Sequence, residues 1–166
     1  RMKIGLVTPY AFPNPGGVND HVASLYRVLR ARGHDVRIIT SSHGLQKASE
    51  GDILRIGKGF SVPFNGSMGT ITLSPTYLRQ MRDVLARERF DVLHFHEPFA
   101  PLLGYAELLR AKRPHIGTFH RSGGGPAYSL TGPLLRRLLA GVPSRVAVSA
   151  SAADTLRRAT GATATV

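Results

Sequence analysis

Apolar runs of strand length alternate with segments of helical period along the whole chain of 166 residues. This alternation constrains the fold most strongly, because strands joined by crossover helices form a parallel sheet rather than a sandwich. The expected strands cover residues 3–8, 35–40, 53–56, 60–63, 70–73, 91–96, 115–119 and 145–149, and residues 163–166 are a candidate for another. The pattern predicts an α/β fold with a Rossmann-like parallel sheet and helices on both faces.

Helix signals separate these strands. The segment 18–32 has apolar residues on one stripe, and Gly33 stands where a glycine ends a helix. Ser74 and Pro75 form an N-cap followed by proline at the first helical position, which predicts a helix that runs to residue 89. Further helices are expected at 101–111, 133–140 and 151–159. Residues 53–73 are predicted to form a hairpin-rich insertion with Asn65 and Gly66 as its turn.

Composition limits the domain count and the class of partner. A chain of this length with 42% hydrophobic and 19% charged residues forms one well-buried domain, 1–166. The lack of cysteine excludes a disulfide framework and fits a cytoplasmic protein. The net charge of +12 attracts phosphate-bearing partners. No basic tail or aromatic-basic repeat is present, so no nucleic acid is expected, and no apolar run reaches the roughly 20 residues that a membrane span needs.

The first strand leads through a proline-rich loop into Gly16, Gly17 and the first helix. Exposed backbone amides at the start of a helix above a parallel sheet are a common site for phosphorylated ligands. A glycine pair also occurs in turns that bind nothing, because glycine accepts positive φ angles. The loop therefore predicts an anion site only in combination with other residues of the same sheet edge.

Polar residues follow several of the predicted strands at their carboxyl ends, where ligands bind in open α/β sheets. These residues are Tyr10 with the glycine pair, His96 and Glu97, then His120, Arg121 and Ser122, and finally Ser149. His120 is the strongest candidate for chemistry, since three glycines follow it closely and such loops often close over ligands. Ser149 is interpreted as the N-cap of the last helix, because no Gly-x-Ser-x-Gly motif surrounds it.

Other chemistries have weaker support. A two-carboxylate hydrolase is disfavoured because Asp35 and Asp91 begin strands and therefore lie at the opposite edge. His94 and His96 share one face of a strand, so a metal-dependent hydrolase that also uses His120 stays open beside the simpler interpretation of structural histidines. A stand-alone module that binds a phosphorylated metabolite through the glycine loop is a further alternative.

Several motifs in register resemble one enzyme group. They are Thr8-Pro9-Tyr10, Pro15-Gly16-Gly17-Val18 with His21, Phe64-Asn65-Gly66-Ser67, the run FDVLHFHEP at 90–98, Thr118-Phe119-His120, and Val146-Ala147-Val148-Ser149. Together they resemble the N-terminal domain of retaining GT-B glycosyltransferases, most closely the bacterial phosphatidylinositol mannosyltransferase type. The resemblance covers nearly the whole chain. It implies one half of a GT-B fold, with the C-terminal donor-binding domain absent from this chain, and hence an isolated domain without turnover.

The resemblance also implies roles for residues. Gly16 and Gly17 would offer amides to the donor diphosphate, and His120 would contact the donor sugar and act in catalysis. Acceptor-binding residues would be Tyr10, Asn19, Asn65, Arg121 and Ser122. The donor would be a nucleotide sugar such as GDP-mannose, with no metal and no other cofactor.

Departures from the family pattern widen the range of acceptors. A lysine and a threonine of the mannosyltransferases correspond here to Gly125 and Tyr128, and a pocket glutamine corresponds to Asn19. The expected acceptor is therefore a lipid-linked compound or a small polyol. The helix that resembles the basic membrane-contacting segment of the family keeps Arg79 and Arg82. Peripheral contact with an anionic membrane, on the inner face, is a further expectation.

Overall fold

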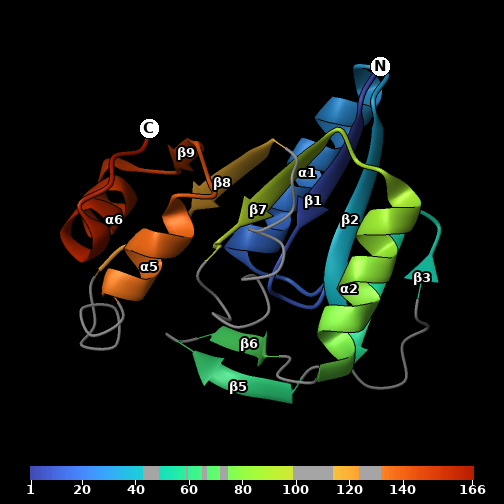
Figure 1. Ribbon diagram of the computed structural model, residues 1–166, viewed down its shortest axis with the longest axis horizontal. Coiled ribbons are helices and arrows are strands. Elements are labelled where there is room, and N and C mark those ends of the chain that lie inside the picture. The colour runs from blue at the N-terminus through green and yellow to red at the C-terminus, as the bar shows by residue number, and fades with distance from the viewer. Residues whose placement is uncertain (43–48, 59, 65–66, 72–74, 99–113, 124–131) are drawn as a thin grey trace.

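The computed structural model describes residues 1–42, 49–58, 60–64, 67–71, 75–98, 114–123 and 132–166 (Figure 1). The expected helix at 101–111, the Asn65-Gly66 turn and the N-cap Ser74 lie outside the described residues. The elements are β1 (Lys3–Val7), α1 (Gly17–Ala31), β2 (Asp35–Ser42), β3 (Ser49–Glu50), β4 (Ile53–Lys58), β5 (Phe60–Phe64), β6 (Ser67–Ile71), α2 (Pro75–Glu88), β7 (Val92–His96), β8 (His115–Phe119), α5 (Gly132–Leu139), β9 (Ser144–Ala147) and α6 (Ala150–Thr160).

The main sheet has the strand order β3-β4-β2-β1-β7-β8-β9. All neighbouring strands are parallel except β3, which runs antiparallel to β4. The strands after β1 extend the sheet first to one side through β2 and β4, and then to the other side through β7, β8 and β9. The order therefore reverses between β1 and β7, and ligands of such sheets bind outside the carboxyl ends of the strands at this point. The predicted Rossmann-like architecture is confirmed.

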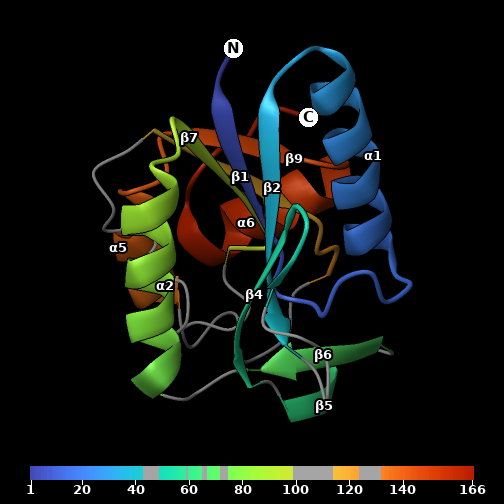
Figure 2. The same ribbon diagram turned by 90° about the vertical axis from the view of Figure 1, so that its right-hand side faces the viewer.

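The predicted extent of the insertion is wrong in one respect. Strand β4 belongs to the main sheet, where it pairs in parallel with β2. Its side chains Leu54 and Ile56 are buried in the same apolar cluster as Met81 of α2, so burial assigns it to the core. Within the described ranges, β5 and β6 form a separate antiparallel pair, which lies beyond the carboxyl edge of the main sheet (Figures 1 and 2).

Helices cover both faces of the sheet, as predicted. Helix α1 lies on one face, and α2 and α5 lie on the other (Figure 2). The α1 face contains the buried side chains Ile4, Leu6, Phe12, Val22, Val36 and Ile38. On the opposite face, Leu93 and Phe95 of β7 pack with residues of α2. Because side chains alternate along a strand, His94 and His96 of β7 are directed to the α1 face.

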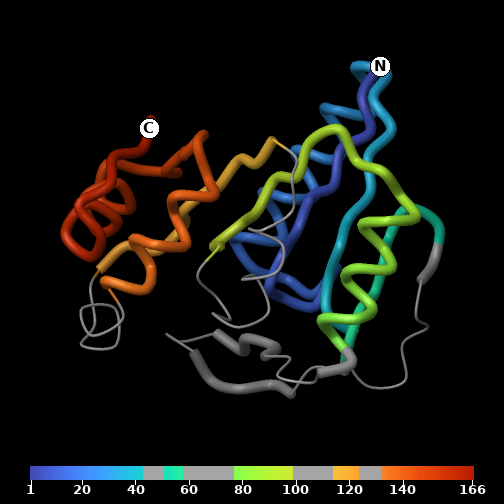
Figure 3. The backbone as a smooth tube through the Cα atoms, viewed as in Figure 1, coloured from blue at the N-terminus to red at the C-terminus, as the bar shows by residue number. Residues whose placement is uncertain are grey.

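The end of the chain lies beside β9. Ser149 caps α6, since its hydroxyl accepts a hydrogen bond from the Ala152 amide at 3.2 Å, which confirms its predicted role. The candidate strand at 163–166 is reduced to one parallel bridge between Thr165 and Val146. The backbone trace shows this last segment next to β9 (Figure 3). None of the helices within the described ranges combines the length and apolarity that a bilayer crossing requires.

Candidate functional site

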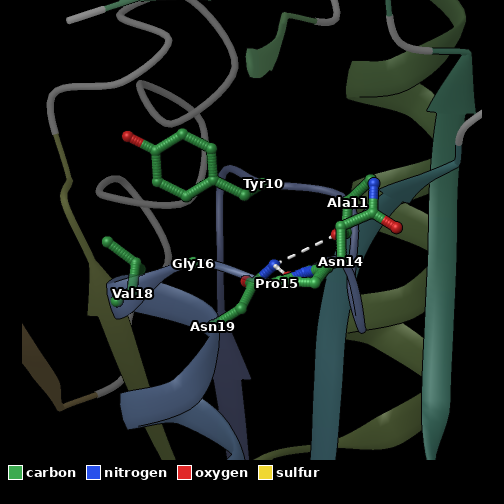
Figure 4. A pocket seen from close by; sticks show the side chains of 8 residues that line it. Tyr10, Ala11, Asn14, Pro15, Gly16, Val18 and Asn19 are labelled. Carbon is green, nitrogen blue, oxygen red and sulfur yellow. Dashed lines mark hydrogen bonds between the residues drawn. The ribbon is translucent and has the colours of Figure 1, made fainter. Parts of the chain in front are cut away.

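The loop that follows β1 is organised by one buried amide side chain. Asn19 of α1 is 4% exposed, and its Oδ1 accepts a hydrogen bond from the Thr8 hydroxyl at 2.9 Å. Its Nδ2 donates to the carbonyl oxygens of Ala11 at 3.1 Å and Asn14 at 2.8 Å (Figure 4). These bonds tie both ends of the loop to the first turn of the helix. The predicted contact between Asn19 and an acceptor stays a prediction, and the geometry gives this residue a loop-shaping role.

The two glycines at the start of α1 are exposed, and no side chain of the described residues caps the helix at Gly16. Gly16 is the N-cap at φ 156° and ψ 147°, a backbone conformation that favours glycine. A Cβ atom on Gly16 or Gly17 would meet no atom within 4 Å. Within the described part of the chain, the first turn of the helix therefore borders open space, where the helix dipole favours an anion.

This open space is a pocket of about 380 Å³. Its lining residues are Tyr10, Ala11, Asn14, Pro15, Gly16, Gly17, Val18 and Asn19 (Figure 4). The ring of Tyr10 stands above the helix start in this view. The predicted glycine and tyrosine ligands therefore line one cavity.

Two charged residues from other parts of the chain act on the phenol of Tyr10. Burial raises the pKa of its phenol, the negative charge of Glu97 raises it further, and Arg121 acts in the opposite direction. These electrostatic effects require Glu97 and Arg121 to lie near the phenol. Residues directly after β1, β7 and β8 thus lie near one another at the carboxyl edge of the sheet.

Four histidines pack together beside the pocket. The rings of His94 and His96 stack with centroids 4.5 Å apart, and the rings of His96 and His120 lie 5.6 Å apart. Nδ1 of His96 and Nε2 of His120 are 3.3 Å apart and share a hydrogen bond. His21 of α1 contacts both His96 and His120, with centroid distances of 5.4 Å and 5.2 Å. We refer to these four side chains as the histidine cluster.

The fold explains how the histidine cluster forms. Strand alternation directs His94 and His96 to the α1 face, and the same alternation places His120 with Thr118 of β8. The Thr118 hydroxyl is bonded to Nε2 of His94 at 2.6 Å. His21 lies one helical turn after Gly17, so the cluster is about one turn from the exposed helix start. The glycine bend and His120 therefore belong to the same edge of the sheet.

Burial disfavours the charged form of His94, His96 and His120. Burial, with a smaller contribution from neighbouring histidines, lowers the pKa of His94 and of His120 to about 4. The pKa of His96 is also far below its ordinary value, for the same reasons. Neutral imidazoles can donate and accept hydrogen bonds but do not supply a positive charge near neutral pH.

The backbone around His120 is fixed by its neighbours. Its amide donates to Oε2 of Glu97 at 2.9 Å, while the Glu97 amide donates to the Thr118 carbonyl at 2.8 Å. Glu97 is 4% exposed and has a left-handed backbone with φ 51°. Beyond the exposed Ser122, the amide of Gly123 donates to the Thr155 hydroxyl of α6 at 3.0 Å. The predicted residue Asn65 lies outside the described residues, as do Gly125 and Tyr128.

Sequence reasoning missed His21 as a member of the site and Glu97 as the support of His120. The available signal for His21 was its spacing of one helical turn from the glycine pair. No group of three or more His, Cys, Asp or Glu residues is arranged to hold a metal ion within the described ranges. The described residues therefore add no support to the metal-dependent hydrolase.

Comparisons with known proteins place the chain in a family. Residues 15–166 match the model of Glycosyltransferase Family 4. A phosphatidyl-myo-inositol mannosyltransferase of Mycolicibacterium smegmatis is 40% identical over 73% of this chain and 31% of its own length. The enzyme of that name from Mycobacterium tuberculosis is 35% identical over 95% of this chain and 40% of its own length. The chain therefore spans less than half the length of the curated relatives that it matches.

Among solved structures, sucrose-phosphate synthase from Thermosynechococcus elongatus superposes with a TM-score of 0.71 at 16% identity. The superposition covers 100% of this chain and 47% of the synthase. At this identity the likeness concerns the fold, which is one Rossmann-like half of a GT-B architecture. From the family match and the sequence relatives we conclude that the chain belongs to glycosyltransferase family 4.

Proposed function

We propose that the chain is the N-terminal, acceptor-side domain of a retaining glycosyltransferase. The enzyme transfers a hexose from a nucleotide sugar, with GDP-mannose as the candidate donor, to a lipid-linked or small polyol acceptor. The observation that carries the proposal is the uncovered start of α1 at Gly16 and Gly17, which opens into a pocket about one helical turn from the histidine cluster. A second, donor-binding domain completes the cleft.

The proposed chemistry uses the helix start as an anion site. The acceptor hydroxyl attacks the anomeric carbon, the bond from that carbon to the diphosphate oxygen breaks, and the hydroxyl proton leaves with the diphosphate. Negative charge grows on the leaving group, and backbone amides aimed at that charge stabilise it. The dipole of α1 adds to this effect, so the domain supplies stabilisation without a metal ion.

The other site residues receive roles from their positions. His120, as a neutral imidazole, forms a hydrogen bond with the donor sugar and places it against the acceptor. Tyr10, which lines the pocket, and Arg121, whose charge acts on the Tyr10 phenol, bind the acceptor together with Ser122. The matched relatives are named for phosphatidyl-myo-inositol, which supports a polyol or a lipid-linked polyol as the acceptor class.

A peripheral position on the inner face of the cytoplasmic membrane is part of the proposal. The net charge of +12 favours an anionic surface, and Arg79 and Arg82 are exposed on α2. Membrane attraction of this kind falls as salt rises, because it depends on screened charges.

The test uses the full-length enzyme with a panel of labelled sugar nucleotides, and with either phosphatidylinositol vesicles or free polyols. Transfer from one donor is expected, and the variant His120→Ala is expected to lower kcat by at least about 100-fold. His34→Ala is the matched control, since His34 lies at the far end of α1 and accepts a hydrogen bond from the Met2 amide. Unchanged kcat in His120→Ala would remove His120 from the mechanism. Tight binding of a phosphorylated ligand without transfer from any donor would favour the binding module instead.

A further inference from the structure

His120 is held by two hydrogen bonds, one made by its main chain and one by its ring. Its main-chain amide is bonded to Glu97, and its ring Nε2 is bonded to Nδ1 of His96 at 3.3 Å. The ring of His21 approaches edge-on at an angle of 86°. Among the described residues, none is bonded to Nδ1 of His120, so this nitrogen is the one that remains for a ligand.

The hydrogen bond between His96 and His120 requires that one ring donates and the other accepts. Both rings are neutral near pH 7, so each carries one proton on one of its two nitrogens. Two arrangements are possible, and they differ in which nitrogen of His120 is protonated. The surroundings of His96 decide between them.

His96 is enclosed by other side chains. Its side chain is completely buried, stacks on His94 at an interplanar angle of 24°, and contacts His21. His94 is itself fixed by the Thr118 hydroxyl. Nε2 of His96 is buried and has no hydrogen-bond partner among the described residues.

This unpartnered nitrogen distinguishes the two arrangements. If His120 donated to His96, the proton of His96 would lie on Nε2 as a buried N–H group without an acceptor. Buried N–H donors without partners are rare and costly in proteins, more so than acceptors that lack a donor. If His96 instead donates from Nδ1, its Nε2 keeps only a lone pair, and the cost is smaller.

We propose that His96 is a positioning residue that holds His120 in the tautomer with its proton on Nδ1. His120 then offers an N–H donor to an oxygen atom of the bound substrate, which in the proposed function is a hydroxyl of the donor sugar. The identity of this oxygen as a sugar hydroxyl rests on the proposed function, whereas the tautomer follows from the geometry of the two rings. In proteins the tautomer of a histidine is set by the hydrogen bond of its other nitrogen.

The decisive measurement is a long-range ¹H–¹⁵N NMR spectrum of the protein labelled with [¹⁵N]histidine, recorded near pH 7. The His120 signals are assigned by their disappearance in His120→Gln. The expected pattern is a protonated Nδ1 and an unprotonated Nε2 in His120, with a protonated Nδ1 in His96. A protonated Nε2 in His120 would overturn the proposal, even if no variant of His96 folds.

Variants separate positioning from packing. His96→Phe keeps an aromatic ring but removes the donor, so Nε2 of His120 is expected to become protonated. His96→Asn places an amide N–H near the former Nδ1 and is expected to restore the original pattern. His94→Phe is the matched control, because His94 is in the same stack and is not bonded to His120. In this variant the two ring nitrogens of His120 should show the same protonation as in the wild type. An unchanged His120 pattern in His96→Phe would contradict the role of His96.

Activity gives an independent readout in the full-length enzyme. His96→Phe is expected to lower kcat by about tenfold or more with little change in KM, because a wrong tautomer weakens the transition state more than substrate binding. His96→Asn is expected to recover most of that loss. If no sugar transfer is found while Nδ1 of His120 is protonated, the proposed function fails and the tautomer assignment stands.

Discussion

The two edges of the main sheet use polar residues in opposite ways. At the amino edge, Nζ of Lys3 pairs with Glu88 at 2.8 Å, and the Lys3 amide donates to the Asp91 carboxylate at 2.7 Å. These groups are partly exposed and carry full charges. At the carboxyl edge, Asn19 and His96 are buried, and their hydrogen bonds join uncharged groups.

The difference indicates where the molecule tolerates change. Water can replace a lost partner at the amino edge, so each ion pair there contributes little. A buried group at the carboxyl edge has no such replacement, and removal of one partner leaves the other unsatisfied. Substitutions and pH changes that act on the carboxyl edge should therefore have larger effects than equivalent changes at the amino edge.

Acid gives the largest expected loss of stability. His94 has a pKa of about 4 in the folded protein and 6.5 in the unfolded chain. Between these values the unfolded chain binds a proton that the folded protein does not, so the contribution is complete above pH 6.5 and is lost as the pH falls toward 4. His94 alone accounts for on the order of 3 kcal/mol of this loss. Urea unfolding at pH 7, 6, 5 and 4 measures it.

The acid experiment has a direct control. His94→Phe removes one titrating group from the histidine cluster and should flatten the dependence of the unfolding free energy on pH. If the unfolding free energy of the wild type did not change between pH 7 and pH 4, the pKa of His94 would not be lowered in the folded protein.

Loss of the buried amide should be the next largest effect. Asn19→Ala removes three hydrogen bonds that hold the loop after β1. We expect a decrease of about 2 kcal/mol in the free energy of unfolding. Asn14→Ala is the control, because Asn14 contributes its main-chain carbonyl and has an exposed side chain. Equal thermal stability of the two variants would contradict the loop-shaping role.

A methyl group at the helix start should separate binding from stability. Gly17→Ala has room for its Cβ and replaces glycine by a better helix former, so thermal stability should be kept or rise by up to about 1 kcal/mol. The methyl lies at the pocket and partly covers the amides, so calorimetry on the full-length enzyme should show GDP binding weakened about tenfold. Ser24→Ala, on the exposed side of α1, should leave GDP binding unchanged. If Gly17→Ala bound GDP as tightly as the wild type, the diphosphate would not bind at the start of α1.

The amino edge should show the smallest effect. Lys3→Met breaks the ion pair with Glu88, whose pKa is lowered chiefly by its hydrogen bond to Lys3. The expected loss of stability is less than about 1 kcal/mol and should shrink further in high salt. A loss as large as that of Asn19→Ala, measured by urea unfolding, would remove the contrast between the two edges.

Much of the fold could be predicted because its elements depend on local patterns. The spacing of apolar residues located α1 and the central strands, and the parallel order then placed Gly16 and His120 at one edge. Strand β4 was assigned to the insertion because a short apolar run has the same appearance in a hairpin and in a sheet. Its burial against α2 depends on contacts between distant residues, which the local sequence does not contain.

The details of the site were harder to predict for a similar reason. The role of Asn19 depends on the path of a loop that brings the carbonyls of Ala11 and Asn14 to one point. The membership of His21 in the cluster depends on the rotation of α1 above the sheet. The spacing of residues along a helix predicts which of them share a face, but it does not predict which strand residues lie opposite that face.

The left-handed backbone at Glu97 sets two selective pressures against each other. Such a conformation costs a residue with a side chain about 1 kcal/mol or more, a strain that glycine avoids. Glycine at position 97 would relieve this strain but would also remove the carboxylate that accepts the His120 amide, so the two effects oppose each other in a library screened only for heat resistance. A library of the full-length protein screened for the proposed sugar transfer should retain glutamate, so thermostabilisation is best carried out with that codon held constant.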